Sequence, residues 1–225
     1  EQSARRRSAG TGGFALFGKS SMPVYHDLNS PEGRDFYGLD EADLGGVEVV
    51  PVRVRDGDDA SCLNLNRAQQ PRLLGVRPEV LHTRAAFTFT HIENQEFQDR
   101  PWMILDEKRL DGAIPAIADH DTVLWGLGKS LGDDLRYTDE AGHVFRLRVV
   151  GMLKSSVLQG NVIISEDNFT ARFPSEGGYR TFLIDAPAQR VTEIATILSQ
   201  GLEDVGLTLT PAARRLAQFM AVQNT

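Results

Sequence analysis

Cysteine is nearly absent from this sequence: the 225 residues include one, Cys62. A single cysteine cannot form an intrachain disulfide, which excludes a disulfide-stabilised fold. The nearest basic residue along the chain is Arg67, so no immediate neighbour is positioned to lower the pKa of the thiol. We interpret Cys62 as a small buried apolar residue and not as a nucleophile.

Long hydrophobic runs are also missing. The apolar stretches, of which Val123–Trp125 is typical, do not approach the ~20 consecutive residues needed to cross a bilayer. The basic triplet Arg5–Arg7 leads into glycine and serine and not into the apolar core of a signal peptide. We therefore expect the chain as given to be soluble and to begin without a signal peptide.

Basic residues are outnumbered. The chain has 24 Lys and Arg against 31 Asp and Glu, and its formal net charge is −7. Nucleic-acid-binding domains usually carry a basic stripe, whereas the one dense basic run here is Arg5–Arg7. We therefore expect no nucleic-acid partner.

The rest of the composition is typical of a globular protein, with 41% hydrophobic and 24% charged residues. A chain of this length buries roughly 70% of its extended surface, so a substantial core can form. That core could belong to one large domain or to two small ones.

Strand and helix patterns alternate in the C-terminal third. Apolar residues at spacings of three and four predict a helix that begins at Pro187 and ends at a left-handed cap, Gly206. A final helix is predicted after Pro211, with Leu216 and Phe219 on its apolar side. The predicted strands of this part are 179–184 and 207–209.

The remainder of the chain is predicted to be rich in short strands. We predict short helices at 30–38, from Asp119 through Leu131, and after the capping residue Ser165. The predicted strands are 14–17, 47–55, 84–92, 100–106, 135–137, 144–153 and 162–164. Beside the alternating C-terminal third, this pattern predicts an α+β fold.

One segment, Gly13–Ser20, satisfies the phosphate-binding pattern GxxxxGK[ST]. A phosphate cradle also needs a strand before it and a helix after it. Here a polar tail precedes the segment, the four loop positions are Phe, Ala, Leu and Phe, and Pro23 opposes a following helix. We therefore interpret Gly13–Ser20 as a strand and not as a nucleotide site.

No pattern predicts catalysis, so we expect no enzyme activity, no cofactor and no bound metal. The histidines lack metal-ligand spacing, and the GxSxG motif of serine hydrolases is absent. The acidic turn 56–59 lacks the glutamate that completes a calcium loop. Trp102 and Trp125 are open to two interpretations: residues of the core or of a contact between subdomains, or aromatic walls of a binding cleft.

Seven strings distributed over most of the chain point to a known family. They are 10–16 (GTGGFAL), 23–29 (PVYHDLN), 63–71 (LNLNRAQQP), 158–160 (LQG), 163–166 (IISE), 173–174 (FP) and 221–225 (AVQNT). Together they resemble the large extracytoplasmic domain of FtsX-like (MacB-type) ABC-transporter permeases.

The resemblance implies a two-part organisation. Both chain ends, 1–81 and 179–225, would form a discontinuous porter-like α/β module. Residues 82–178 would form an inserted, β-rich, sabre-like lobe. The strand-rich middle of the sequence agrees with this division.

The resemblance also implies a location and a set of partners. The domain would lie on the extracytoplasmic (periplasmic) side of the cell inner membrane, between the first and second transmembrane helices of the permease. ATP hydrolysis would belong to a separate or fused cytoplasmic ABC ATPase. Further partners would be a second permease copy and a periplasmic protein or lipid-linked substrate.

On this basis we expect mechanotransmission: ATP-driven movement of the membrane helices shifts the domain, which exports or extracts a substrate or activates a partner. The stroke would pass through both ends of the chain. The candidate lever residues are Gly10, Gly12, Gly13, Phe14, Leu216, Phe219, Gln223, Asn224 and Thr225. The alternative is a ligand- or lipid-binding module that selects the substrate in a cleft between the lobes, with Trp102 or Trp125 in its wall.

Overall fold

The computed structural model of the protein describes residues 6–57 and 70–223, and its strands belong to one mixed sheet. The strands are β1 (Leu16–Val24), β2 (Glu48–Arg55), β3 (Leu73–Val76), β4 (Phe89–Ile92), β5 (Ile114–Asp119), β6 (Asp134–Thr138), β7 (Val144–Leu153), β8 (Val162–Ser165), β9 (Tyr179–Asp185) and β10 (Thr208–Pro211). Their order across the sheet is β10-β1-β9-β2-β3-β8-β5-β7-β4, and β6 pairs with β7.

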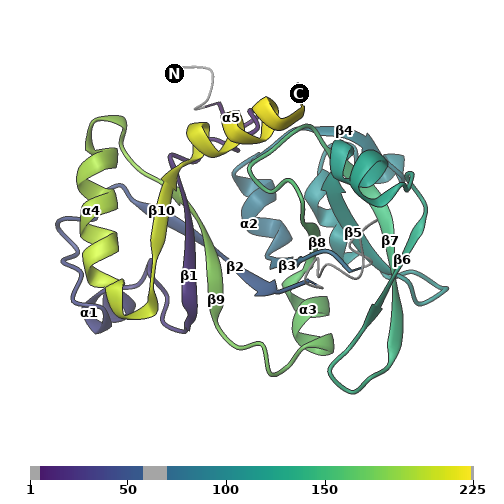
Figure 1. Cartoon of the computed structure of the whole chain (residues 1–225), viewed down its shortest axis with the longest axis horizontal. Coiled ribbons are helices and arrows are strands. Elements are labelled where there is room, and N and C mark those ends of the chain that lie inside the picture. The colour runs from purple at the N-terminus through teal and green to yellow at the C-terminus, as the bar shows by residue number, and fades with distance from the viewer. Residues whose placement is uncertain (1–5, 58–69, 224–225) are drawn as a thin grey trace.

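Helices cover this sheet on several sides (Figure 1). The α-helices are α1 (Pro31–Phe36), α2 (Pro78–Thr83), α3 (Glu166–Arg172), α4 (Val191–Gly201) and α5 (Ala212–Gln223). The 3₁₀ helices are η1 (Gln95–Phe97), η2 (Pro101–Asp106), η4 (Ala188–Arg190) and η5 (Glu203–Val205), and η3 (Thr122–Leu127) is a π-helix. The predicted mixture of α and β structure is confirmed. None of the helices in the described part of the chain is both long and apolar enough to span a membrane.

Both ends of the chain build one half of the molecule, on the left in Figure 1. There β1 lies between β10 and β9, and α1 and α4 pack beside these strands. The predicted amphipathic helix corresponds to α4, which buries Ile194 and Leu198 against Phe182 and Ile184 of β9. Gly206 adopts the expected left-handed conformation, with φ of 69°.

The middle of the chain builds the other half. In this half β3 pairs with β8 and β5 pairs with β7 in parallel, and the strands predicted at 135–137 and 144–153 correspond to β6 and β7, which form an antiparallel hairpin. Ser165 caps α3 as predicted, since its hydroxyl accepts a hydrogen bond from the Asn168 backbone N–H at 3.2 Å. Phe169 and Phe173 lie in the core of this half.

Strand β2 joins the two halves into a continuous sheet. Residues Glu48–Val52 pair with β9, and residues Arg53–Arg55 pair with β3. A hydrophobic core also spans the junction, because Phe17 and Leu183 share it with Ile117 and Ile163. The predicted domain boundary at 81/82 falls inside α2, and the one at 178/179 immediately precedes β9. The division of the chain at these positions stays a prediction.

Three predicted elements of the middle section are wrong or too long. Residues 101–106 form η2 and not a strand, because Pro101 has a fixed φ suited to a first helical turn. The strand predicted at 84–92 is reduced to β4, since Ala85 and Phe87 have positive φ values of 48° and 68°. The helix predicted from Asp119 through Leu131 is limited to residues 120–127, which include η3 and end at the left-handed Gly128.

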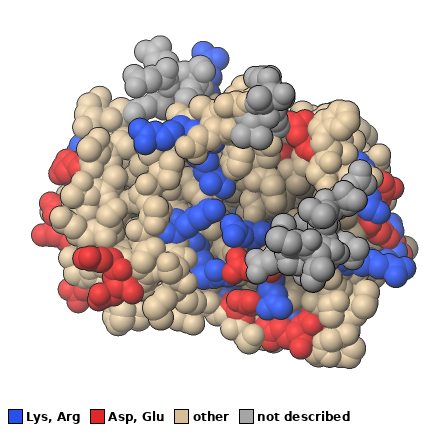
Figure 2. Space-filling model, in the orientation of Figure 1, with Lys and Arg blue, Asp and Glu red and all other residues tan. Residues whose placement is uncertain are grey.

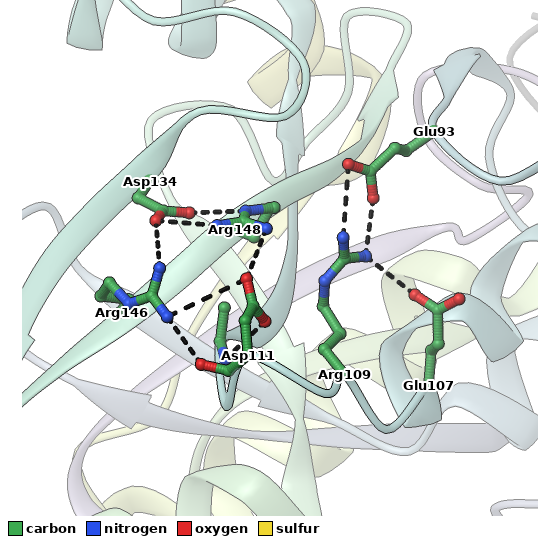
Figure 3. Close-up of polar contacts among 8 residues, drawn as sticks. Glu93, Glu107, Arg109, Asp111, Asp134, Arg146 and Arg148 are labelled. Atoms are coloured by element: carbon green, nitrogen blue, oxygen red, sulfur yellow. Dashed lines mark hydrogen bonds and ion pairs between the residues drawn. The ribbon is translucent and has the colours of Figure 1, made fainter.

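Ion pairs fix the loop before β5 to the outer strands of the second half (Figure 3). Asp134 of β6 accepts hydrogen bonds from Arg146 at 2.9 Å and from Arg148 Nε at 2.7 Å. Arg148 also donates to Asp111 at 2.7 Å, and Arg109 donates to Glu93 and Glu107 at 2.7 and 2.9 Å. Each guanidinium in this network faces a carboxylate, so we interpret the cluster as stabilising the structure and not as a binding site.

Candidate functional site

The two ends of the described chain enter the sheet side by side at the top of the molecule (Figure 1). Strands β1 and β10 pair antiparallel from Leu16 opposite Pro211 to Lys19 opposite Thr208. Helix α5 continues directly from β10, and its first N–H, on Ala212, donates to the Ala15 carbonyl at 2.9 Å. The two terminal segments are therefore mechanically linked where they join the fold.

A tight turn precedes β1. The Gly12 N–H donates to the Ala9 carbonyl at 2.8 Å, and Gly12 and Gly13 have φ values of 65° and 82°. A Cβ on Gly12 would lie 2.7 Å from the Phe87 ring. Phe14 follows with 2% of its surface exposed, and its ring centre lies 6.2 Å from that of Phe87. The turn is thus seated against the second half of the molecule.

Arg84 forms polar contacts beside the N-terminal turn. It follows α2 in the second half, and its guanidinium forms ion pairs with Glu48 of β2 and, at 2.5 Å, with Asp185 of β9. The same guanidinium lies over the Phe14 ring, 4.8 Å from its centre. One buried arginine therefore connects the N-terminal turn and two strands of the first half to the second half.

The loop at residues 154–158 contacts both terminal segments. The Val157 N–H donates to the Gly10 carbonyl at 2.9 Å, and the Val157 carbonyl accepts from Arg215 Nε of α5 at 2.9 Å. A methyl group at Gly10 would collide with the Ser155 carbonyl and would lie 2.8 Å from Leu216. We call this region the terminal junction: residues 10–15, the start of α5 and the loop 154–158.

A buried carboxylate holds that loop in place. Asp119 ends β5, is fully buried, and accepts hydrogen bonds from the Ser156 N–H at 2.6 Å and the Ser156 hydroxyl at 2.8 Å. The same hydroxyl accepts from the Leu158 N–H at 3.1 Å. Burial raises the pKa of Asp119 to about 7, although the bonds from Ser156 oppose the shift.

The predicted lever residues fall partly within the terminal junction. Gly10, Gly12, Gly13 and Phe14 form its N-terminal turn, and Leu216 packs against the core that spans the two halves. Phe219 lies one turn further along α5 and is half-buried under Arg215. Gln223 ends α5, whereas Asn224 and Thr225 lie outside the described residues. Their role in force transmission stays a prediction.

Sequence reasoning missed Asp119, Ser156 and Arg215. Asp119 was expected to cap the helix predicted through Leu131. It does precede the helical residues 120–127, but it is the last residue of a strand and its side chain bonds to Ser156 instead. The available signal was the position of this carboxylate at the end of an apolar run, 114–118. A carboxylate that is buried together with such a run needs a hydrogen-bond donor. Its donor is 37 residues away in sequence, which no local pattern reveals.

The two tryptophans have different environments. Trp102 is 1% exposed, and its indole N–H donates to the Ala86 carbonyl at 2.8 Å, so it belongs to the core. Trp125 is 79% exposed. It lines a depression of about 750 Å³ together with Thr122, Leu127 and Gln159. Cys62 lies outside the described residues.

Across 6–57 and 70–223, no three His, Cys, Asp or Glu side chains gather in a way that could hold a metal ion. His91 and His120 stack with their ring centres 5.8 Å apart, and His120 Nδ1 lies 3.3 Å from Asp121.

The solved structures that are similar to this chain include the following two. One is the periplasmic region of MacB from Actinobacillus actinomycetemcomitans, with a TM-score of 0.41 and 12% identity, covering 96% of this chain and 95% of that one. The other is the extracellular domain of the ABC-type transporter YknZ from Gram-positive bacteria, with a TM-score of 0.39 and 14% identity, covering 87% of this chain and 99% of that one. No protein-family model matches the sequence. No curated protein matches it either.

Proposed function

We propose that this chain is the extracytoplasmic domain of an ABC-transporter permease and that it transmits movement from membrane helices to a substrate or partner outside the cytoplasm. The seven sequence strings support the class of protein. The terminal junction supports the mechanical role, because β1 and β10 are paired and both terminal segments bond to the loop 154–158. A displacement applied to either end is thereby passed to the second half.

The route of this displacement follows from the contacts. Movement of α5 acts on the loop through Arg215, and movement of the N-terminal turn acts on it through Gly10. Asp119 connects the loop to β5 in the centre of the second half. Packed interiors transmit strain because they are dense and have low compressibility. In this proposal the membrane helices are attached beyond both ends, and ATP hydrolysis belongs to a cytoplasmic ATPase.

The test uses the full-length natural polypeptide, reconstituted with the ATPase that copurifies with it. In a C62S background, Ser155→Cys with Leu216→Cys places one thiol on the loop and one on α5, at two residues that adjoin Gly10. A short bifunctional crosslinker then joins the two thiols. The crosslink fixes α5 and the loop at one separation and so prevents the two halves from moving relative to each other. We therefore expect at least tenfold slower ATP hydrolysis, restored when a cleavable linker is cut. The matched control is Thr138→Cys with Val144→Cys, which joins two strands of the second half that are already paired.

The control should leave ATP hydrolysis unchanged, because its crosslink adds no restraint between the two halves. Equal rates for both crosslinked proteins would contradict the mechanical role. A natural polypeptide with no membrane-embedded helix and no associated ATPase would contradict the class of protein itself.

The depression beside Trp125 favours a second candidate function, the binding of a ligand or lipid. An exposed indole at the edge of an apolar depression can stack on a flat ring or cover an acyl chain. The depression is lined by η3 and residues 159–160 of the second half, so it is not the cleft between lobes that the sequence suggested. Titration with a short-chain acyl ligand should change the emission of Trp125, and Trp125→Phe should abolish that response. A response that persists in Trp125→Phe would exclude this site.

A further inference from the structure

Positive charge gathers on the face of the molecule that carries β1 and α5, although the chain as a whole is acidic. Figure 2 shows Lys and Arg side chains in a row down the middle of the face that carries β1 and α5, whereas acidic side chains lie mainly nearer the rim. Three cations influence one another electrostatically: Lys19 of β1, Arg215 of α5 and Arg72, which precedes β3. We call these three residues the basic patch.

Aromatic rings fix the geometry of the patch. Arg215 Cζ lies 3.9 Å from the centre of the Phe17 ring, and Lys19 Nζ lies 5.9 Å from the same centre. The Arg215 guanidinium is also 4.8 Å from the Phe219 ring, and its Nε donates to the Val157 carbonyl. Arg215 is therefore held in one orientation beside a flexible lysine.

The three cations repel one another. Burial, and to a lesser extent the charge of Arg72, lowers the pKa of Arg215 to about 10. Burial lowers the pKa of Lys19 as well, Arg215 and Arg72 add to that shift, and Asp56 opposes it more weakly. Neighbouring like charges disfavour the charged forms unless an anion compensates them.

The described carboxylates supply little compensation. Asp56 forms an ion pair with Arg72 at 3.4 Å, but it is shared with Arg180 at 3.1 Å and is mostly exposed. Within 6–57 and 70–223, neither Lys19 nor Arg215 has an ion pair, and the two Nη groups of Arg215 have no hydrogen-bond partner. In Figure 3, by contrast, every labelled arginine faces a carboxylate. The basic patch differs in that two of its three cations lack such a partner among the described residues.

We propose that the basic patch binds a phosphate group, carried either by a lipid headgroup or by a free phosphorylated molecule. Lys19 and Arg215 both lie over the Phe17 ring, so one anion can contact both of them, and Arg72 adds a further positive charge to the same region. A pre-oriented guanidinium loses little side-chain entropy when it forms a two-point contact, and an ammonium adds a mobile point charge. This inference rests on the charges and rings of the patch and does not require the transporter role.

The first experiment measures binding of inorganic phosphate to the whole 225-residue chain by thermal denaturation and calorimetry, against chloride at equal ionic strength. We expect phosphate to raise Tm, because a ligand that binds the folded state stabilises it. Lys19→Gln should weaken phosphate binding about tenfold, in line with the loss of one charge-assisted contact. Lys19 is exposed on β1, so this variant is expected to fold.

Arg215→Lys tests the geometry, since it keeps the charge and loses the planar fork. It should also weaken binding. The matched control is Arg136→Gln, which removes one positive charge from an exposed site on β6 and should bind phosphate as the wild type does. Each variant is first compared with the wild type by its unfolding transition without phosphate.

A second arm identifies the source of the phosphate. Cosedimentation with phosphatidylglycerol vesicles, lost with Lys19→Gln and absent with phosphatidylcholine vesicles, would indicate a lipid headgroup. Phosphate binding without vesicle binding would indicate a free phosphorylated ligand. The proposal is overturned if neither probe binds, or if Arg136→Gln weakens binding as much as Lys19→Gln and Arg215→Lys do.

Discussion

The carboxylate of Asp119 accepts two hydrogen bonds from one residue, Ser156, at 2.6 and 2.8 Å, in a fully buried position. This pair connects the end of β5 to the loop that bonds both terminal segments of the chain. A buried carboxylate costs free energy when it is ionised and is retained where its hydrogen bonds specify a local conformation. The Asp119–Ser156 pair is therefore both a positioning contact and a titratable one.

The first prediction concerns pH. Because the pKa of Asp119 is raised from 3.8 to about 7, the folded protein holds this proton more tightly than the unfolded chain. Its contribution to stability is complete below about pH 4 and is lost as the pH rises to about 7. Asp119→Asn should therefore flatten the fall in the free energy of unfolding between pH 4 and 7, measured by urea denaturation. Asp99→Asn, at an exposed site, is the control, and an unchanged slope in Asp119→Asn would refute the assignment.

The second prediction has the opposite sign. Hydrogen bonds from Arg148 and then Arg146 lower the pKa of Asp134, so its contribution is present above its ordinary pKa and is lost as the pH falls below about 4. Asp134→Asn should lower stability at pH 6 and reduce the further loss on acidification. Parallel urea titrations of the wild type and the variant from pH 6 to 2.5 measure this. A constant difference between the two proteins at all pH values would show that Asp134 does not titrate as expected.

The third prediction separates the tryptophans. Trp102→Phe removes the donor to the Ala86 carbonyl in the core and should cost about 1–3 kcal/mol of stability. Trp125→Phe, at an exposed site, should change stability by no more than about 0.5 kcal/mol. Trp102→Phe should also leave red-shifted emission, whereas Trp125→Phe should leave blue-shifted emission. Equal losses of stability in the two variants would contradict the assignment of Trp102 to the core and of Trp125 to the surface.

Local structure was predicted correctly where a residue and its near neighbours determine the backbone conformation or the buried face. Ser165 as a helix cap, Gly206 as a left-handed cap, and the apolar face of Ile194 and Leu198 were all visible, because each depends on neighbours within one turn. The short segment around Pro101 was misread as a strand. Its apolar residues fit either structure, and the packing of Trp102 selects the helical turn.

The candidate site was predicted only in outline. The glycines of the N-terminal turn and Leu216 stood out as features of the two ends. The contacts that make them a junction could not be predicted, because Val157 lies 58 residues from Arg215. Likewise, nothing in the local spacing of Lys19, Arg72 and Arg215 indicates that their charges influence one another. Long-range pairings of this kind depend on the whole sheet order.

The last prediction tests how tightly the N-terminal turn is seated. Gly12 and Gly38 have nearly identical φ values, 65° and 64°, but a Cβ at Gly12 would lie 2.7 Å from the Phe87 ring, whereas a Cβ at Gly38 would have nothing within 4 Å. Gly38→Ala should therefore report backbone strain alone, about 1–2 kcal/mol. Gly12→Ala should add overpacking of a further 1–3 kcal/mol or so. Urea denaturation of both variants measures the difference, and equal losses would mean that the turn yields and that Phe87 does not hold it in place.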